Sequence, residues 1–279
     1  MPPRTVLITG CSTGIGRACA ERLARNGHTV YATARRPEAI ADLEAAGCRT
    51  LALDVTDEAS MQAAVEAVEA ERGAVGALVN NAGYSQSGAV ETLSTDDLRR
   101  QFETNVFGLV RMCQLVLPGM RRAGFGRIVN MSSMGGNFVF PGAGAYHASK
   151  YAVEAISDAL RFEVKGFGVG VTVIQPGAIR TEFADTVADR LPEGEGPYAA
   201  FNADVGRVTK EAYEKGPLAR LGGEPDAVAK AVEKAITARR APIRTRVTAS
   251  AHVLVTQRRL LPDRGWDAFV ATQFKRPGS

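Results

Sequence analysis

Short apolar segments alternate along this chain with longer segments in which apolar residues recur every three or four positions. Short apolar runs are typical of buried strands, and a period near 3.6 residues is typical of helices that bury one face. The alternation predicts strands at 5–9, 29–33, 50–53, 76–80, 127–132, 169–175 and 243–247, and helices at 15–26, 37–46, 58–72, 97–122 and 145–165.

Two of the predicted helices begin with residues that cap helices well. Thr56 precedes the helix 58–72 and is predicted to be its N-cap, with Asp57 and Glu58 in the first turn where negative charge favours the helix dipole. Ser94-Thr95-Asp96-Asp97 resembles a capping box and predicts the start of a long helix that reaches Arg122.

Strands that alternate with helices pair in parallel and form a doubly wound α/β sheet. Such sheets bind ligands at the carboxyl ends of their strands, near the point where the strand order switches. We therefore expect the residues that follow the strands to share one rim: Gly10–Gly16, 34–36, Asp54, 80–83, Ser132-Ser133 and 176–181.

The segment Thr9-Gly10-Cys11-Ser12-Thr13-Gly14-Ile15-Gly16 lies between the first strand and the first helix. Gly10 permits a sharp turn, and the other two glycines remove side chains where a pyrophosphate and the next strand come close. The spacing differs from the commoner GxGxxG motif, and an ordinary glycine-rich turn is the alternative. Its position after the first strand favours a dinucleotide site and a three-layer Rossmann fold with a parallel sheet of about seven strands.

Residues 178–226 interrupt the alternation of strands and helices. A connection this long in a compact domain is typically a functional lid or a disordered segment. Its apolar and aromatic residues favour a lid over an apolar site, or a small core beneath the loop: Phe183, Leu191, Tyr198, Phe201 and Tyr213. No domain boundary is visible, so residues 1–279 are predicted to form a single domain with a substrate lid at about 178–226. Residues 253–274 are expected to form helical turns around Pro262.

Composition and charge exclude several classes of protein. The chain has 279 residues, 45% of them hydrophobic, and a net charge of only +4 with basic pairs at scattered positions. Nucleic-acid binding needs a concentrated basic face, so we expect no nucleic-acid partner. The four cysteines lack CxxC spacing and are expected to be core residues, while the three histidines lack ligand spacing, so no metal site is expected. Neither a signal peptide nor a membrane span is predicted, and we expect a cytoplasmic protein.

Tyr146 and Lys150 are spaced i and i+4 on a predicted helix and therefore lie on one face. A tyrosine pKa of about 10 must fall for acid–base work near neutral pH, which requires roughly 3–4 kcal/mol. One positive charge at about 4 Å supplies about that much at an effective dielectric constant near 20. This reasoning predicts that Lys150 lowers the pKa of Tyr146, although a solvated surface pair is the alternative.

Two further polar positions stand out near this helix. Asn105 lies on the apolar stripe of the long helix, and a buried amide there must be hydrogen-bonded. It could bond to the neighbouring backbone as a core residue. The functional alternative is that it holds a water or a helix bend beside the site. Ser132 and Ser133 end the fifth strand at the ligand-binding rim. Either hydroxyl is placed to hold a substrate oxygen, and a turn before Gly135-Gly136 is the alternative.

Taken in order, these motifs resemble the short-chain dehydrogenase/reductase family, in its compact single-domain branch. The resemblance spans about residues 4–182 and rests on the glycine-rich segment, Asn80-Asn81-Ala82-Gly83, Asn105, Ser133, Tyr146-His147-Ala148-Ser149-Lys150, and Pro176-Gly177 followed by Thr181. Ser133 is preferred to Ser132 because it lies thirteen positions before Tyr146, as in the family.

The resemblance implies a catalytic role for four residues. Tyr146 would be the general acid when a carbonyl is reduced and the base in the reverse direction. Lys150 would lower the pKa of Tyr146 and bind the nicotinamide ribose. Ser133 would polarise the substrate oxygen, and Asn105 would anchor a water in a proton relay.

The resemblance also implies the residues that contact the cofactor and the substrate. Asn81 and Gly83 would lie near the adenosine ribose, Asp54 at the adenine edge, and Thr181 at the carboxamide. The implied cofactor contacts are Gly10, Ser12, Thr13, Gly14, Ile15, Gly16, Arg35, Arg36, Asp54, Val55, Asn81, Ala82, Gly83, Tyr146, Lys150, Pro176, Gly177, Ile179 and Thr181. The expected substrate contacts are Ser133, Met134, Phe138, Tyr146 and Phe183.

Arg35 and Arg36 indicate which cofactor is preferred. NAD-binding sites place an acidic residue after the second strand, but this chain has Ala34 there, followed by the two arginines. A guanidinium group binds a 2′-phosphate well, whereas a carboxylate repels it. We therefore predict NADP(H), with Arg35 as the leading contact and Arg36 assisting.

The apolar residues after Ser133 and in the lid predict a bulky hydrophobic alcohol or ketone as substrate. The segment Val30-Tyr31-Ala32-Thr33-Ala34-Arg35 and the Gly-Cys-Ser loop resemble the 17β-hydroxysteroid and retinol dehydrogenase-like members, so a steroid, retinoid or polyketide-like carbonyl is expected. The alternatives are a β-ketoacyl or polyketide thioester reductase and a non-catalytic regulatory or scaffold protein. Family resemblance implies a homodimer or homotetramer through helices 97–122 and 145–165.

Overall fold

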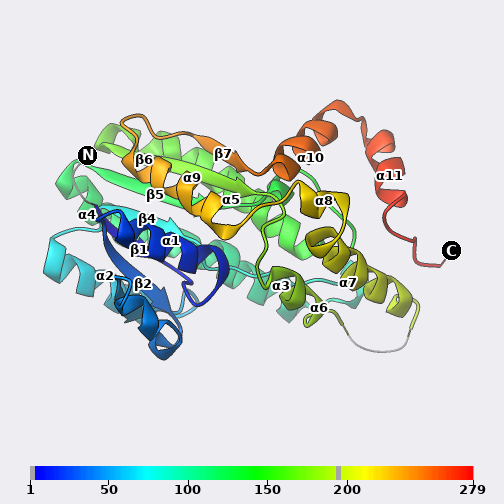
Figure 1. Cartoon of the computed structure of the whole chain (residues 1–279), viewed down its shortest axis with the longest axis horizontal. Helices are drawn as coiled ribbons and strands as arrows, with labels where there is room; N and C mark the ends of the chain where they lie inside the picture. Colours follow the sequence, from blue (N-terminus) through cyan, green and yellow to red (C-terminus); the bar gives the residue numbers. More distant parts are fainter. Residues whose placement is uncertain (1–3, 193–195, 279) are drawn as a thin grey trace.

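The computed structural model describes residues 4–192 and 196–278. In this part of the chain a parallel sheet of seven strands has the order β3-β2-β1-β4-β5-β6-β7 (Figure 1). The strands are β1 (Thr5–Ile8), β2 (Thr29–Ala34), β3 (Arg49–Ala52), β4 (Ala77–Asn80), β5 (Gly126–Met131), β6 (Val169–Pro176) and β7 (Arg244–Val247). The predicted doubly wound sheet is confirmed. Its strand order reverses at β1, which lies between β2 and β4, so the loops after β1 and β4 diverge and leave a crevice at the carboxyl edge.

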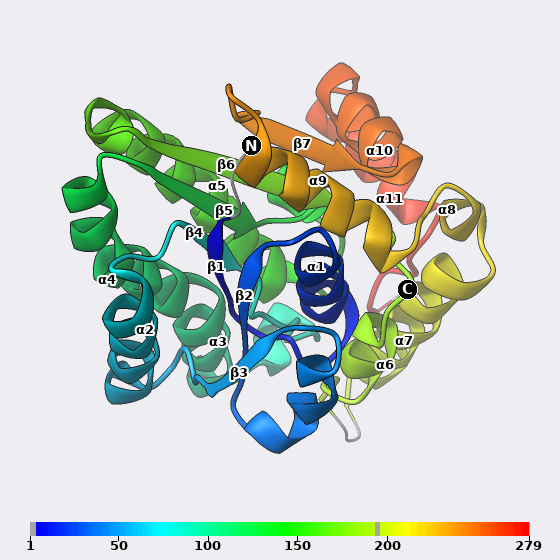
Figure 2. The same cartoon turned by 60° about the vertical axis from the view of Figure 1, so that its left-hand side comes forward.

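Helices cover both faces of the sheet, as Figure 2 shows. On one face α1 (Gly14–Arg25) and α9 (Pro225–Thr237) pack side by side with the 3₁₀ segment η1 (Pro37–Glu44). The other face carries α2 (Glu58–Arg72), α4 (Gly108–Ala123) and α5 (Gly144–Val164). In β1, Val6 and Ile8 enter the first core and Leu7 enters the second, because successive side chains of a strand point to opposite faces.

The long helix predicted to reach Arg122 is not continuous. It divides into α3 (Thr95–Phe102), a π-helical segment η3 (Glu103–Phe107) and α4. Asn105 lies inside the π-helical segment, and its amide is bonded to the backbone of Tyr84, as one of its alternatives expected. The wider turn interrupts the regular i to i+4 bonding and changes the direction in which side chains project, which is typical of functional sites.

The two predicted caps have different outcomes. Ser94 and Asp97 form the predicted capping box at the start of α3. Thr56 is not the cap of α2: Asp57 is, and its carboxylate accepts the N–H groups of Ala59 and Ser60. The Thr56 hydroxyl donates instead to the Asp54 carboxylate at 2.8 Å, which draws Thr56 into the loop after β3.

The segment predicted as a lid includes residues 193–195, which lie outside the described residues, and the rest of it contains helices. These are α6 (Phe183–Ala188), α7 (Ala199–Glu214) and α8 (Pro217–Arg220). They lie at the same end of the molecule as the C-terminal helices α10 (Ala249–Leu260) and α11 (Asp263–Ala271), which are separated at Pro262 (Figure 1). Phe274, after α11, packs in one cluster with Phe201 and Val205 of α7. Among the described residues, no helix is long and apolar enough to cross a membrane.

Candidate active site

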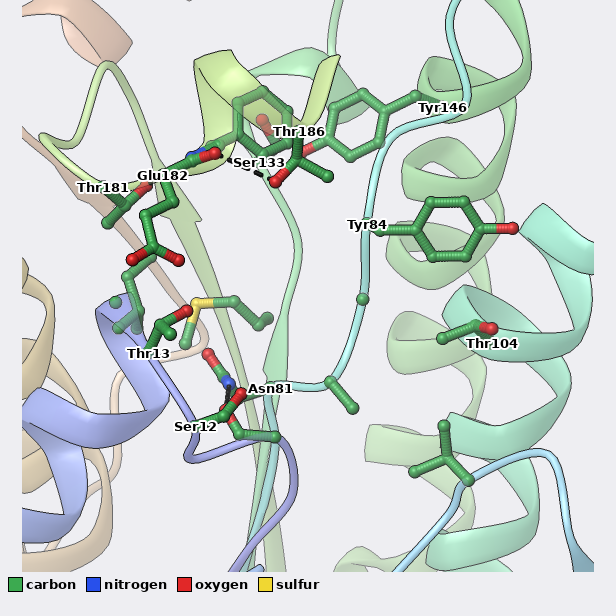
Figure 3. A pocket seen from close by; sticks show the side chains of 18 of the residues that line it. Ser12, Thr13, Asn81, Tyr84, Thr104, Ser133, Tyr146, Thr181, Glu182 and Thr186 are labelled. Carbon is green, nitrogen blue, oxygen red and sulfur yellow. Dashed lines mark hydrogen bonds between the residues drawn. The ribbon is translucent and has the colours of Figure 1, made fainter. Parts of the chain in front are cut away.

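A cavity of about 600 Å³ opens at the carboxyl edge of the sheet. Its wall includes residues from every segment predicted to share the rim, so that prediction is confirmed. From these segments come Gly10, Ser12, Thr13, Gly14, Ile15, Ala34, Arg35, Asp54, Asn81, Ala82, Gly83, Ser132, Ser133, Pro176, Gly177, Ile179 and Thr181; Val55, Tyr146, Lys150 and Phe183 also line it. Figure 3 shows Ser12, Thr13 and Asn81 in one part of this cavity and Ser133, Tyr146, Thr181 and Thr186 in another.

The glycine-rich loop leaves space over the N-terminus of α1. Gly10 has φ of +73° and Gly14 has φ of +56°, a conformation that favours glycine. A Cβ at Gly16 would lie 2.1 Å from the carbonyl oxygen of Gly10, so only glycine fits there. Thr13 is the N-cap, and within the described chain its side chain accepts no bond from the first-turn N–H groups. These N–H groups therefore remain available to an anion at the positive end of the helix dipole.

Thr9 and Asn81 hold the glycine-rich loop against the loop after β4. The Asn81 side chain donates to the carbonyl oxygens of Thr9 and Gly10 at 3.0 and 2.9 Å. In return, the Thr9 hydroxyl accepts the backbone N–H groups of Asn81 and Ala82, both at 3.0 Å. Asn81 thus shapes the crevice through the backbone of its neighbour, in addition to lining it.

Arg35 lies exposed at the end of the cavity formed by β2 and β3. Ala34, the last residue of β2, and Val55, in the loop after β3, line the same end of the cavity. The Asp54 carboxylate accepts both the N–H and the hydroxyl of Thr56, which fixes its orientation at this edge. Arg36 is also exposed but does not line the cavity, and it precedes η1 as its N-cap.

Tyr146 and Ser133 face each other across the deep end of the cavity. Ser133 lies two residues after the end of β5, and its oxygen accepts the N–H of Gly135 at 3.1 Å, so its hydroxyl can still act as a donor. Burial raises the pKa of Tyr146 to about 12, and a hydrogen bond with Ser133 lowers it in part. The predicted lowering of this pKa by Lys150 is therefore wrong for the structure described here, because desolvation of the phenolate outweighs the other contributions.

Lys150 lies one turn after Tyr146 with its Nζ 5.7 Å from the centre of the tyrosine ring. The ammonium is buried and donates to the carbonyl oxygen of Met131 at 2.9 Å. Burial lowers the pKa of Lys150 to about 8, while the charge of Glu154 raises it. The i, i+4 spacing thus brings the phenol and the ammonium together at the cavity, as predicted, rather than at the surface.

Asn105 is buried next to the cavity and does not line it. Its side-chain N–H groups donate to the Tyr84 carbonyl and to the Ser149 hydroxyl at 2.9 and 3.0 Å, and its oxygen accepts the Tyr84 N–H at 3.1 Å. A Cβ at Gly83 would lie 3.1 Å from this oxygen and 3.7 Å from Lys150 Nζ. Glycine at this position therefore keeps open the space between Asn105 and Lys150.

His147, the neighbour of Tyr146, anchors the loop that follows Ser133. Its Nδ1 lies 2.8 Å from the Gly135 carbonyl oxygen, and its Nε2 accepts the Phe140 N–H at 3.1 Å. This pair of bonds requires a neutral ring that carries its proton on Nδ1. Burial accordingly lowers the pKa of His147 to about 4.

The low pKa of His147 predicts a loss of stability in acid. The pKa of His147 is about 6.5 in the unfolded chain, so the neutral ring contributes fully to stability above that pH. As the pH falls toward about 4, the free energy of unfolding should decrease by roughly 3 kcal/mol. His147→Gln removes the titration and keeps an acceptor. Denaturant unfolding from neutral to acidic pH should therefore show a larger loss for the wild type than for H147Q. Equal losses would contradict this role.

An aromatic series covers Tyr146 from the lid side. Ring centres are 5.5 Å apart for Tyr146 and Phe183, and 5.6 Å apart for Phe183 and Tyr213. Burial and the nearby Tyr146 raise the pKa of Tyr213. Phe183 belongs to α6 and Tyr213 to α7, so the predicted lid segment contributes both residues to the cavity wall.

Met134 and Phe138, predicted to contact the substrate, lie outside the cavity wall. After Ser133 a 3₁₀ turn, η4 (Met134–Gly136), redirects the chain away from the rim. Both side chains are buried in a cluster with α10 and α11, where the Phe138 ring lies 5.3 Å from Trp266. Both side chains therefore pack against the C-terminal helices instead of lining this cavity.

Several residues of the cavity wall were not predicted. Tyr84 directly follows the Asn81-Ala82-Gly83 motif, and this position in the chain is the only signal that points to it. Tyr213 was identified only as an aromatic residue of the lid. Glu182, Thr186 and Arg190 belong to the segment predicted as a lid, but they were not singled out. The remaining additions are Leu53, Thr56, Arg100, Glu103, Thr104 and Met131.

Comparison with known proteins identifies the family. The family model described as short chain dehydrogenase matches residues 4–191, which include the glycine-rich loop, Ser133, Tyr146 and Lys150.

The chain belongs to the short-chain dehydrogenase family.

Relatives of this chain, and solved structures that are similar to it, match it along most of its length. It is 38% identical to the 3-ketodihydrosphingosine reductase of Bacteroides thetaiotaomicron, over 94% of this chain and 95% of that one. It is 35% identical to a short-chain dehydrogenase from Streptomyces avermitilis, with a TM-score of 0.80 over 97% and 95% of the two chains. It is 30% identical to the closed form of a serine dehydrogenase complexed with NADP⁺, with a TM-score of 0.74 over 87% and 94%.

Proposed function

We propose that this short-chain dehydrogenase reduces a carbonyl group on a hydrophobic substrate with NADPH, and that Tyr146 donates the proton. The observation that carries this proposal is the cavity itself, in which Tyr146, Ser133 and Lys150 share one wall with the glycine-rich loop and Arg35. A proton donor, a hydroxyl that can hold an oxygen and a phosphate-binding loop in one cavity fit carbonyl reduction.

The glycine-rich loop fits a dinucleotide. Its open conformation and the available N–H groups of α1 would hold the pyrophosphate, with Ser12 and Thr13 beside them. Thr181, which lies beside Gly14, and Ile179 also line the cavity and would hold the nicotinamide end near Tyr146. The bound cofactor would supply the hydride. The protein residues would orient it and control the proton.

Arg35 supports a preference for NADP(H). It is exposed at the adenosine end of the cavity, and among the described residues no carboxylate forms an ion pair with it. Ala34 precedes it where NAD-binding sites carry an acid. The similar serine dehydrogenase was solved with NADP⁺, which is consistent with this choice. We assign Arg36 no direct contact, because it does not line the cavity.

Tyr146 and Ser133 would act on the substrate oxygen together. A raised pKa keeps the Tyr146 phenol protonated at neutral pH, which is the state needed to donate to a developing alkoxide. The Ser133 hydroxyl, whose oxygen accepts the Gly135 N–H, would donate its proton to the same substrate oxygen. The positive charge of Lys150 would stabilise the phenolate after the transfer, and a water between Asn105 and Lys150 would return the proton.

The protonation state of the Lys150 side chain predicts how the rate of reduction depends on pH. Because the pKa of Lys150 is about 8, the ammonium should lose its proton above that pH and kcat/KM should fall. Lys150→Arg keeps the charge and should remove this decline, although at a lower rate because the guanidinium cannot reproduce the bond to Met131. Steady-state pH profiles of both proteins test this. An alkaline decline of the same midpoint in K150R would contradict the assignment.

The aromatic lid supports a bulky apolar substrate. Phe183 and Tyr213 give the substrate end of the cavity an apolar wall next to Tyr146. The relative from Bacteroides thetaiotaomicron is named as a ketone reductase. Steroid, retinoid and polyketide-like ketones therefore remain the substrate classes that we propose, with residues 178–226 as their lid.

An NADPH-consumption screen across steroid, retinoid, quinone and acyl-thioester carbonyls tests the reaction and the substrate class together. The proposal expects turnover of at least one free hydrophobic ketone. Selective turnover of acyl thioesters would support the thioester reductase alternative. Excess positive charge around the cavity would favour that alternative, but Arg100 and Arg190 are balanced there by Glu103 and Glu182. NADPH binding without turnover of any carbonyl would favour a non-catalytic role.

Helix α5 supports the proposed homo-oligomer. Tyr151 and Phe162 are eleven residues apart on α5, which places them on one face three turns apart, and Phe162 is 87% exposed. Phe107, in the neighbouring η3, is 54% exposed. Large exposed aromatic residues on adjacent elements are typical of interaction surfaces. We propose that this face joins two copies of the chain, in a dimer or as part of a tetramer.

A further inference from the structure

Positive charge is concentrated at the C-terminal end of the chain. Residues 239–279 contain eight arginines, one lysine and two aspartates, which gives this segment a net charge of +7. Since the whole chain carries +4, the other 238 residues carry −3. The molecule is therefore polarised, with its excess positive charge on β7, α10, α11 and the adjoining loops.

One side of this segment combines charge with exposed apolar residues. On α10, Val253 is 49% exposed and Leu260 is 77% exposed, and Arg259 lies beside them on the same solvent-facing side of the helix. Arg264 follows in the first turn of α11 and is also exposed. We call Val253, Arg259, Leu260, Arg264 and the half-buried Arg246 of β7, whose charge interacts with that of Arg259, the basic face. A shallow hollow beside it is lined by His252, Val253, Thr256, Gln257, Leu260 and Leu261.

The arginines of the basic face are not neutralised within the molecule. No carboxylate of residues 4–192 or 196–278 forms an ion pair with Arg246, Arg259 or Arg264. The pKa of Arg246 is lowered by burial and by the charges of Arg259 and Arg244, while the charge of Glu154 raises it in part. Arg246 and Arg259 thus lie close enough for their charges to interact, and neither forms an ion pair among the described residues, whereas Arg244 and Arg258 each pair with acids. Such a cluster attracts an anionic surface.

We propose that the basic face binds the surface of an anionic lipid membrane, with Leu260 and Val253 entering the headgroup region. Basic residues that flank exposed apolar ones on a helix are suited to this interface, where both can be satisfied at once. A nucleic acid would leave Leu260 and Val253 in water. A second copy seated symmetrically on this face would bring its own arginines against these, and like charges at close range repel.

Sedimentation with vesicles tests the proposal on the full chain. Binding to phosphatidylcholine vesicles that contain phosphatidylglycerol is expected, with weak binding to phosphatidylcholine alone and release at high salt. The variant R259E/R264E should bind at least about 25-fold more weakly, since each basic residue contributes about fivefold. Leu260→Asp should also weaken binding. R25E/K165E is the matched control, because it changes the net charge equally at two exposed positions, the last residue of α1 and the residue directly after α5.

Membrane binding is independent of the reaction proposed above, so this test stands whether or not the chain reduces a ketone. Thermal unfolding confirms that each variant is folded. Failure to bind anionic vesicles, or equal binding by all four proteins, would overturn the proposal. It would also be overturned if L260D changed the oligomeric state in sedimentation velocity, or if the wild type preferred duplex DNA to the vesicles, because the face would then serve another partner.

Discussion

Replacing Tyr146 by phenylalanine is expected to lower kcat by about 10²–10⁴-fold while NADPH binding is retained. The substitution removes one hydroxyl from a ring that packs 5.5 Å from Phe183, so the wall of the cavity is preserved and only the proton donor is lost. The phenol is the group whose proton the reaction needs, and its high pKa keeps that proton in place at neutral pH. NADPH oxidation measures kcat, and titration of NADPH fluorescence measures binding.

Tyr151→Phe is the matched control for Y146F. Tyr151 is five residues further along the same helix and 43% exposed to solvent, so loss of its hydroxyl should leave kcat unchanged. If Y146F turned over at the wild-type rate, the proton would have to come from another group. Loss of both binding and turnover would instead mean that the ring is needed to form the cavity.

The double substitution A34D/R35S is expected to change the preferred cofactor from NADPH to NADH. A charged hydrogen bond contributes about 1.5–3 kcal/mol, so loss of the Arg35 guanidinium alone should reduce the preference for NADPH by about 10–100-fold. The new carboxylate at position 34 should repel a 2′-phosphate and accept from a ribose 2′-hydroxyl. The ratio of kcat/KM for the two cofactors, measured with one ketone, reports the change.

Arg36→Ser provides the control for the cofactor prediction. Arg36 adjoins Arg35 and is similarly exposed, but it does not line the cavity, so R36S should shift the ratio only slightly. A ratio that is unchanged in A34D/R35S would show that Arg35 does not select the cofactor. A larger effect of R36S would assign the 2′-phosphate to Arg36.

The sequence was most informative where local pattern determines position. The strand ends could be located from short apolar runs, and parallel pairing then brings Gly10, Arg35, Asn81 and Ser133 to one edge. The spacing of Tyr146 and Lys150 fixed their shared helix face in the same way. These relations depend on a few neighbouring residues and on rules that hold for every doubly wound sheet.

Features that depend on distant contacts were not predicted. The π-helical segment at Asn105 coincides with hydrogen bonds to Tyr84 and Ser149, which are 21 and 44 residues away in the chain. Phe138 leaves the cavity because Trp266, near the other end of the chain, packs against it. The pKa of Tyr146 rises because of its burial, which charge spacing alone does not reveal.

We propose that one cavity holds NADP(H) along the glycine-rich loop, with the reactive end of the cofactor at Tyr146. A crystal structure of the complex with NADP⁺ tests this most directly. We predict the nicotinamide ring beside the Tyr146 and Ser133 hydroxyls and the 2′-phosphate within hydrogen-bond distance of Arg35. A dinucleotide bound with its nicotinamide end away from Tyr146, or bound outside this cavity, would contradict the account.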